Sequence, residues 1–130
     1  MTQGIVLLAH GSRDPQWREP LEAVARRIAE QSPELLVRCA YLELAAPDLQ
    51  TAVAELVLAG VTRLRVLPMF LGMGRHVRED LPRLVAQEQA KHAGVAFSLS
   101  PAVGQHPRLI EALASIALQD DTNATESSIL

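Results

Sequence analysis

The sequence lacks the features that would place the chain in a membrane, in an oxidising compartment or on a nucleic acid. Its single cysteine, Cys39, excludes an intramolecular disulfide, and no apolar run approaches the length that spans a bilayer. The first residues have no basic flank followed by an apolar stretch and a cleavage site, so we expect a cytoplasmic protein. A net charge of -3 gives no general attraction to nucleic acid or membrane, and we expect neither as a partner.

The chain has the size and composition of one compact domain. It contains 130 residues, of which 48% are hydrophobic, and this is enough apolar material for a single core. We expect the domain to occupy residues 1–118 and the polar residues 119–130 to form a flexible tail.

Short apolar runs alternate with longer segments of helical spacing, four times along the chain. The expected strands are residues 5–9, 36–42, 63–68 and 95–99. Their Val, Leu and Ile content is typical of parallel strands covered on both faces. The pattern predicts an α/β fold with a four-stranded parallel sheet, and we expect the strand order 2-1-3-4.

Each predicted strand is followed by a predicted helix. The first begins where Asp14 can cap free N–H groups and Pro15 suits the first helical position, and it runs to about Gln31. The third should follow His76, and it can contain Pro82 only in its first turn. The second and fourth helices are expected at about residues 48–59 and 107–118. The fourth carries an apolar face of Leu109, Ile110, Leu113 and Ile116.

Two loops place a histidine beside glycine directly after an apolar run: AHGSRDP at 9–15 and PMFLGMGRH at 68–76. Glycine admits a ligand close to the backbone, and imidazole can bind a metal or move a proton near neutral pH. Ligands of such sheets bind beyond the carboxyl ends of the strands, where the order reverses. We therefore expect His10 and His76 to face one another there. Each histidine has an alternative interpretation. His10 could only organise the turn that follows it, and His76 could be a solvated surface residue.

The residues around these histidines suit an acidic, flat ligand. Ser12 and Arg13 offer donors ahead of a helix whose positive end favours anions, and Arg75 and Arg78 add positive charge. The apolar segment 69–74 is unusually hydrophobic for a connection. It could cover a planar apolar ligand, form an oligomer interface, or do both.

Three further polar residues follow strands or end helices. Glu43 is either a carboxylate in an apolar setting, with a raised pKa or a partner that makes it a proton acceptor, or an exposed strand-end residue. His92 is expected to be structural, because a cation suits the end of a helix. His106 precedes Pro107 at a helix start, which favours a capping or supporting role over metal ligation.

Four motifs in order resemble the CbiX family of sirohydrochlorin chelatases in its short, single-domain form. They are LAHGSRDP (8–15), YLELAAP (41–47), PMFLGMGRHVREDLP (68–82) and GQHP (104–107), and the resemblance covers residues 4 to about 118. It implies a chelatase-like, flavodoxin-like three-layer sandwich. It also implies a lyase that inserts Co²⁺ or Fe²⁺ into sirohydrochlorin for cobalamin or sirohaem biosynthesis. Short members of the family are expected to form homodimers, in which the substrate cleft is completed between two copies.

The resemblance implies that His10 and His76 handle the metal, with Glu43 near them. Insertion requires the metal to lose water and two pyrrole N–H protons to leave. Neutral imidazoles suit cobalt, iron and also nickel, and the histidines or Glu43 can take the protons. The metal is a substrate, and no permanent cofactor is expected. The candidate substrate-binding residues are Ser12, Arg13, Met73, Gly74, Arg75 and Arg78.

Two other enzyme classes fit the sequence less well. Histidine phosphatases normally place an arginine before the histidine, and Ala9 stands there. A serine hydrolase would need a Gly-x-Ser-x-Gly turn, which the sequence does not contain. A carrier that holds metal or tetrapyrrole in the same cleft without turnover remains an alternative.

Overall fold

The computed structural model describes residues 2–119 of the chain. Its four strands are β1 (Thr2–Ala9), β2 (Leu36–Tyr41), β3 (Val61–Pro68) and β4 (Ala96–Leu99). All pair in parallel, in the order β2-β1-β3-β4. The predicted class and strand order are confirmed. Within the described residues no helix is both long and apolar enough to cross a membrane, and apart from Gln119 the predicted tail lies outside them.

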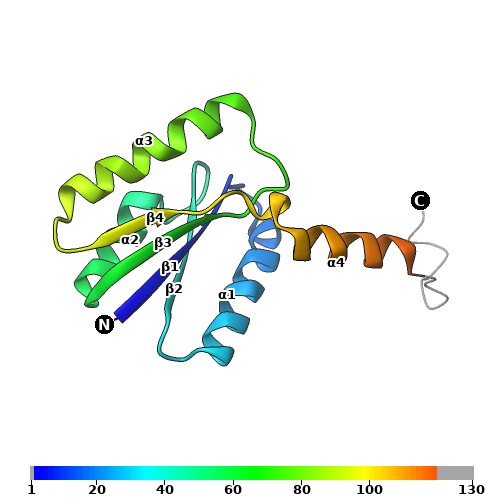
Figure 1. The fold of residues 1–130 in the computed structure, drawn as a ribbon, viewed down its shortest axis with the longest axis horizontal. Helices are drawn as coiled ribbons and strands as arrows, with labels where there is room; N and C mark the ends of the chain where they lie inside the picture. Colours follow the sequence, from blue (N-terminus) through cyan, green and yellow to red (C-terminus); the bar gives the residue numbers. More distant parts are fainter. Residues whose placement is uncertain (1, 120–130) are drawn as a thin grey trace.

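Helices cover both faces of the sheet, which makes a three-layer sandwich (Figure 1). Helix α1 packs on one face, and α2 and α3 pack on the other. Helix α4 extends away from the sheet (Figure 1). The helix bounds are α1 (Glu19–Gln31), α2 (Leu49–Leu58), α3 (Arg75–Lys91) and α4 (Pro107–Leu118), with short 3₁₀ turns η1 (Pro15–Arg18) and η2 (Val103–Gln105).

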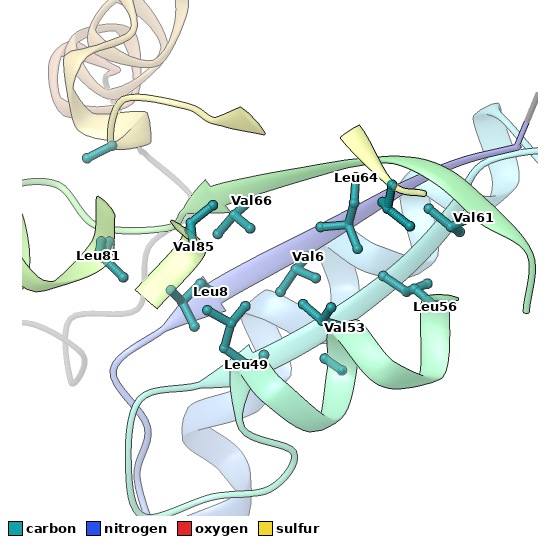
Figure 2. Packing of buried hydrophobic residues seen from close by; sticks show 14 of the residues in the cluster. Val6, Leu8, Leu49, Val53, Leu56, Val61, Leu64, Val66, Leu81 and Val85 are labelled. Atoms are coloured by element: carbon teal, nitrogen blue, oxygen red, sulfur yellow. The ribbon is translucent and has the colours of Figure 1, made fainter. Parts of the chain in front are cut away.

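The main core lies between β1, β3 and the two helices α2 and α3. Figure 2 shows Val53 and Leu56 of α2 pointing toward Val6 of β1 and Leu64 of β3, and all four are almost completely buried. Successive strand side chains point to opposite faces. Leu7 therefore joins a second, smaller cluster under α1. This burial on both faces explains the continuous apolar run at residues 5–9 of β1.

Two helix predictions need correction. The Asp14 side chain does accept a hydrogen bond from the Gln16 N–H at 2.9 Å, but the first turn is 3₁₀ and α1 begins only at Glu19. Pro82 lies inside α3, beyond the first turn that was predicted for it. Pro82 and Arg78 are both exposed, so water can bind the Arg78 carbonyl that has lost its N–H donor.

Asp48 caps α2, and we expect this cap to make stability depend on pH in the acid range. Its carboxylate accepts a hydrogen bond from the Thr51 N–H at 2.8 Å, which lowers the pKa of Asp48 below 3.8. The unfolded chain therefore binds the Asp48 proton more readily than the folded chain. The stabilisation is fully present above the pKa of Asp48 in the unfolded chain, and it is lost as the pH falls through the lower pKa of the folded chain.

The Asp48→Ala variant should lose about 1 kcal/mol of unfolding free energy at neutral pH. Urea unfolding at several pH values measures this, and the difference from the original chain should shrink as Asp48 becomes protonated. Asp48→Asn is the matched control, because asparagine caps a helix without titrating. A difference for Asp48→Ala that stays constant into strong acid would contradict the assignment.

Candidate active site

The site lies at the carboxyl ends of β1 and β3, where the connections leave the sheet in opposite directions. The Met69 N–H donates to the Leu8 carbonyl at 2.7 Å, and the Leu42 N–H donates to the Ala9 carbonyl at 2.9 Å. The chain that follows β1 is therefore held between the chains that follow β2 and β3. This is the switch point at which ligands of parallel sheets bind.

His10 is the first residue beyond β1, and its side chain is exposed. Its ring lies against Phe70, with ring centroids 4.4 Å apart and planes tilted by 42°. The His10 carbonyl accepts a hydrogen bond from the Glu43 N–H at 2.9 Å. The imidazole is thus supported by a buried aromatic ring on one side while the residue remains accessible to a ligand.

Gly11 allows this arrangement. It has a φ of 110°, and a Cβ at this position would overlap the carbonyl oxygen of Glu43. Only glycine fits both the backbone conformation and the close approach of the two loops.

His76 lies at the same edge of the sheet but on a helix instead of a loop. Helix α3 begins at Arg75, so His76 is exposed in its first turn, whereas the sequence predicted a helix beginning after it. Gly74 is the N-cap and provides no side-chain hydrogen bond. The N–H groups of this turn can therefore bind an anion. The structure therefore brings His10 and His76 to one edge of the sheet, with the His10 ring packed against Phe70.

The predicted substrate-binding residues have different local roles. The Ser12 hydroxyl accepts the Asp14 N–H at 3.1 Å and so shapes the turn after His10. Arg75 forms an exposed ion pair with Glu79 at 3.1 Å, which is weak enough for a ligand carboxylate to displace. Arg13 and Arg78 are exposed, Met73 is half-buried against the main core, and Gly74 caps α3.

The apolar segment 69–74 is mostly packed inward, so the expectation of a broad apolar cover needs correction. Phe70 is only 5% exposed, and Met69 and Met73 pack against the two core clusters. Leu71, at 70% exposure, is the large apolar side chain of this segment that faces solvent.

Sequence reasoning missed the specific roles of Phe70 and Gly104. Phe70 supports His10, and the available signal was an aromatic residue directly after the strand that neighbours β1. The Gly104 N–H donates to the Phe70 carbonyl at 2.9 Å, and a Cβ at Gly104 would overlap the Leu71 carbonyl. The η2 turn that leads into α4 is therefore in contact with the loop that supports His10.

Glu43 is exposed, which decides between the two alternatives left by the sequence. The apolar setting was the wrong one, because the chain turns outward after Tyr41 and Leu44 adopts a φ of 63° with half of its surface exposed. His92 is structural as predicted: it ends α3, 3.9 Å from Glu88, with its ring stacked near Phe97. His106 is a cap as predicted, since its Nδ1 accepts the Arg108 N–H at 3.1 Å.

The chemistry available at this edge is that of an open site. Within residues 2–119 no group of three or more His, Cys, Asp or Glu side chains could hold a metal ion. Cys39 lies on the edge strand β2, where burial and then the Glu22 carboxylate raise the pKa of its thiol. The thiolate that would bind a metal is disfavoured there. A metal bound by His10 or His76 would keep most of its coordination positions for other ligands.

Comparisons with known proteins agree with this geometry. The CbiX family model matches residues 4–119. The sirohydrochlorin cobaltochelatase of Methanococcoides burtonii is 31% identical over 91 residues, which cover 70% of each chain. The chloroplastic sirohydrochlorin ferrochelatase of Arabidopsis thaliana is 32% identical over 83% of this chain and 48% of that protein.

Two solved structures are similar to this chain. A CbiX protein from Marinobacter aquaeolei VT8 superposes with a TM-score of 0.79 at 36% identity, over 94% of this chain and 99% of that one. The sirohydrochlorin chelatase SirB from Bacillus subtilis, solved with cobalt, has a TM-score of 0.75 at 23% identity, over 88% of this chain but 49% of its own. With the family model matching almost the entire described chain, this protein is a member of the CbiX family.

Proposed function

We propose that this chain is a chelatase, a lyase that inserts a divalent metal ion, Co²⁺ or Fe²⁺, into sirohydrochlorin. The observation that carries the proposal is the exposed His10 imidazole, held against Phe70 at the switch point of a CbiX-family sheet. The curated relatives named above are a cobaltochelatase and a ferrochelatase of this tetrapyrrole, which supports the same substrate here.

In the proposed reaction, His10 and His76 present the metal ion, and the macrocycle nitrogens replace its remaining ligands. The divalent metal ion binds the four ring nitrogens while two pyrrole N–H protons leave, so the two positive charges of the metal are balanced by the two protons released. Imidazole suits each candidate metal and can also accept a proton. Glu43 lies in an exposed loop whose backbone N–H is bonded to the His10 carbonyl, and this nearness to His10, not an apolar setting, makes it the proposed carboxylate acceptor. A site with few protein ligands favours release of the metal to the macrocycle.

The carboxylates of sirohydrochlorin need partners at the rim of the site. We assign them to the free N–H groups at the start of α3, capped by Gly74, and to Arg13, Arg75 and Arg78. Ser12 holds the turn between His10 and Arg13, and Met73 supports the macrocycle from the core side. Each assignment follows from the position of the residue beside one of the two histidines.

We propose that two copies form a homodimer that completes the cleft, and that the protein acts in the cytoplasm. The product is a metallated tetrapyrrole on the route to cobalamin or sirohaem. Ni²⁺ is a third candidate metal, because imidazole is a suitable ligand for nickel in addition to cobalt and iron.

An anaerobic assay with limiting protein tests the function. Sub-stoichiometric protein should accelerate metal insertion through many turnovers, followed by the change in the visible spectrum of sirohydrochlorin. Co²⁺, Fe²⁺ and Ni²⁺ are compared at equal concentration, with protein-free reactions as controls. A spectral change that stops at one equivalent of protein without faster insertion would indicate a carrier and would reject the chelatase proposal.

A further inference from the structure

Leu44 is held in a backbone conformation that leucine normally avoids. Its φ is 63°, and it is the one non-glycine residue with a positive φ within residues 2–119. Glycine adopts this left-handed conformation at lower cost because it has no Cβ to meet the backbone, and asparagine can offset the cost with a local hydrogen bond. The path of the loop therefore does not explain why a leucine stands at this position.

Packing in the core does not explain Leu44 either. Half of its surface is exposed, and it belongs to neither of the two clusters of core residues in the described chain. The residue before it is fixed beside the site, because the Glu43 N–H donates to the His10 carbonyl at 2.9 Å. Backbone outliers of this kind cluster at active sites and ligand clamps. The position of Leu44 thus points to a ligand contact.

Leu71 occupies a matching position on the other side of His10. It is 70% exposed, and it follows Phe70, whose ring centroid lies 4.4 Å from that of His10. Leu44 follows β2 and Leu71 follows β3, and the strand order β2-β1-β3 puts the His10 loop between them. Each leucine is one residue away from a direct contact of His10, so the two exposed leucines flank the imidazole.

Two exposed apolar side chains beside one metal-binding imidazole suit a flat ring. The arginines of the site can bind the carboxylates at the rim of a tetrapyrrole, but they provide no surface for its apolar face. A ring centred over a metal ion at His10 extends to both sides of the imidazole, where the two leucines lie. Covering these side chains with the ring removes apolar surface from water, and this favours binding.

We propose that Leu44 and Leu71 contact the apolar face of the tetrapyrrole on the two sides of His10 and determine how tightly the substrate binds. The inference rests on the proposed function, because it takes the same substrate. The leucines do not touch the metal ion or the protons that leave. Their contacts are the same in the bound substrate and in the transition state, so they should affect KM and leave kcat unchanged.

Two substitutions of Leu44 separate substrate binding from the stability of the loop. Leu44→Ala and Leu44→Gly both remove the apolar side chain, so each should raise the Kd for metal-free sirohydrochlorin, and the KM, by about 5-fold. Only glycine relieves the positive φ, so Leu44→Gly should unfold at a higher urea concentration than Leu44→Ala. The Kd is measured by quenching of the fluorescence of Trp17, the single tryptophan of the chain.

Leu71→Ala tests the other side of the imidazole and should also raise the Kd by about 5-fold. The double variant Leu44→Ala/Leu71→Ala should raise it by about 25-fold, because separate contacts with one ligand add in free energy. Leu58→Ala is the matched control. Leu58 is 91% exposed at the end of α2, at the opposite edge of the sheet, so its removal should leave Kd, KM and kcat unchanged.

Four results would overturn the leucine contacts. They are an original chain that does not bind sirohydrochlorin, an unchanged Kd in both Leu44 variants, a Kd that returns to the original value in the more stable Leu44→Gly, and an equal rise in Leu58→Ala. Metal insertion is measured separately. Accelerated insertion with an unchanged KM in the leucine variants would reject the contacts and leave the chelatase standing. Sirohydrochlorin binding that depends on the leucines, without accelerated insertion, would reject the chelatase and leave the contacts standing.

Discussion

Replacing His10 with alanine should lower the rate of Co²⁺ insertion into sirohydrochlorin by about 100-fold or more. His10 is exposed at the end of β1, and its ring rests on Phe70 and forms no side-chain hydrogen bond within the described part of the chain. Removing the imidazole therefore takes away a metal ligand or proton acceptor and leaves the core untouched. Initial rates under anaerobic conditions, with the melting temperature as a check on folding, measure the effect.

The dependence on metal concentration separates the two roles of His10. If the imidazole binds the metal, saturating Co²⁺ should restore part of the rate; if it accepts a pyrrole proton, the loss should persist at saturation and respond to pH. His106→Asn is the matched control, because it removes an exposed imidazole outside the site and keeps a residue that can cap α4. A full rate for His10→Ala at limiting metal would show that the site is elsewhere.

The approximate strand positions and the position of the site were predictable because they follow from patterns that are local in the sequence, whereas the strand order 2-1-3-4 was an added expectation that the structure confirms. Each strand is rich in apolar residues and ends near a glycine, proline or polar residue, and parallel strands all end at one edge. The two glycine-flanked histidines therefore had to lie at the same edge. The caps at Asp14 and His106 were predictable for the same reason, since each contacts a backbone N–H only two residues away.

Features that depend on packing between distant segments were not predictable in this way. The apolar stripe of α4 indicates that the helix packs against something, but amphipathicity does not name the partner. Phe70 lies in a segment whose composition suggested an exposed cover, and its burial depends on His10 and Gly104, which come from other parts of the chain. The exposure of Glu43 depends on the path of the loop beyond β2, which no periodic pattern in the sequence determines.

The Gly11→Ala variant should lose about 2–3 kcal/mol of unfolding free energy and most of its insertion activity. The φ of 110° is unfavourable for alanine, and the added methyl group would meet the Glu43 carbonyl, which is backbone and cannot rotate away. The overlap can be removed only if the loops after β1 and β2 separate. This separation would weaken the hydrogen bond from the Glu43 N–H to the His10 carbonyl. Urea unfolding and initial rates measure the two effects.

Gly72→Ala is the matched control for Gly11→Ala. A Cβ at Gly72 meets no atom within 4 Å, and its backbone needs no positive φ, so stability and rate should both change little. Because His10 is fixed partly through its own carbonyl, the activity of Gly11→Ala should fall even under conditions where the variant is fully folded. If Gly11→Ala kept the original rate while folded, the backbone contact between the two loops would not position His10, and support for the imidazole would rest on Phe70 alone.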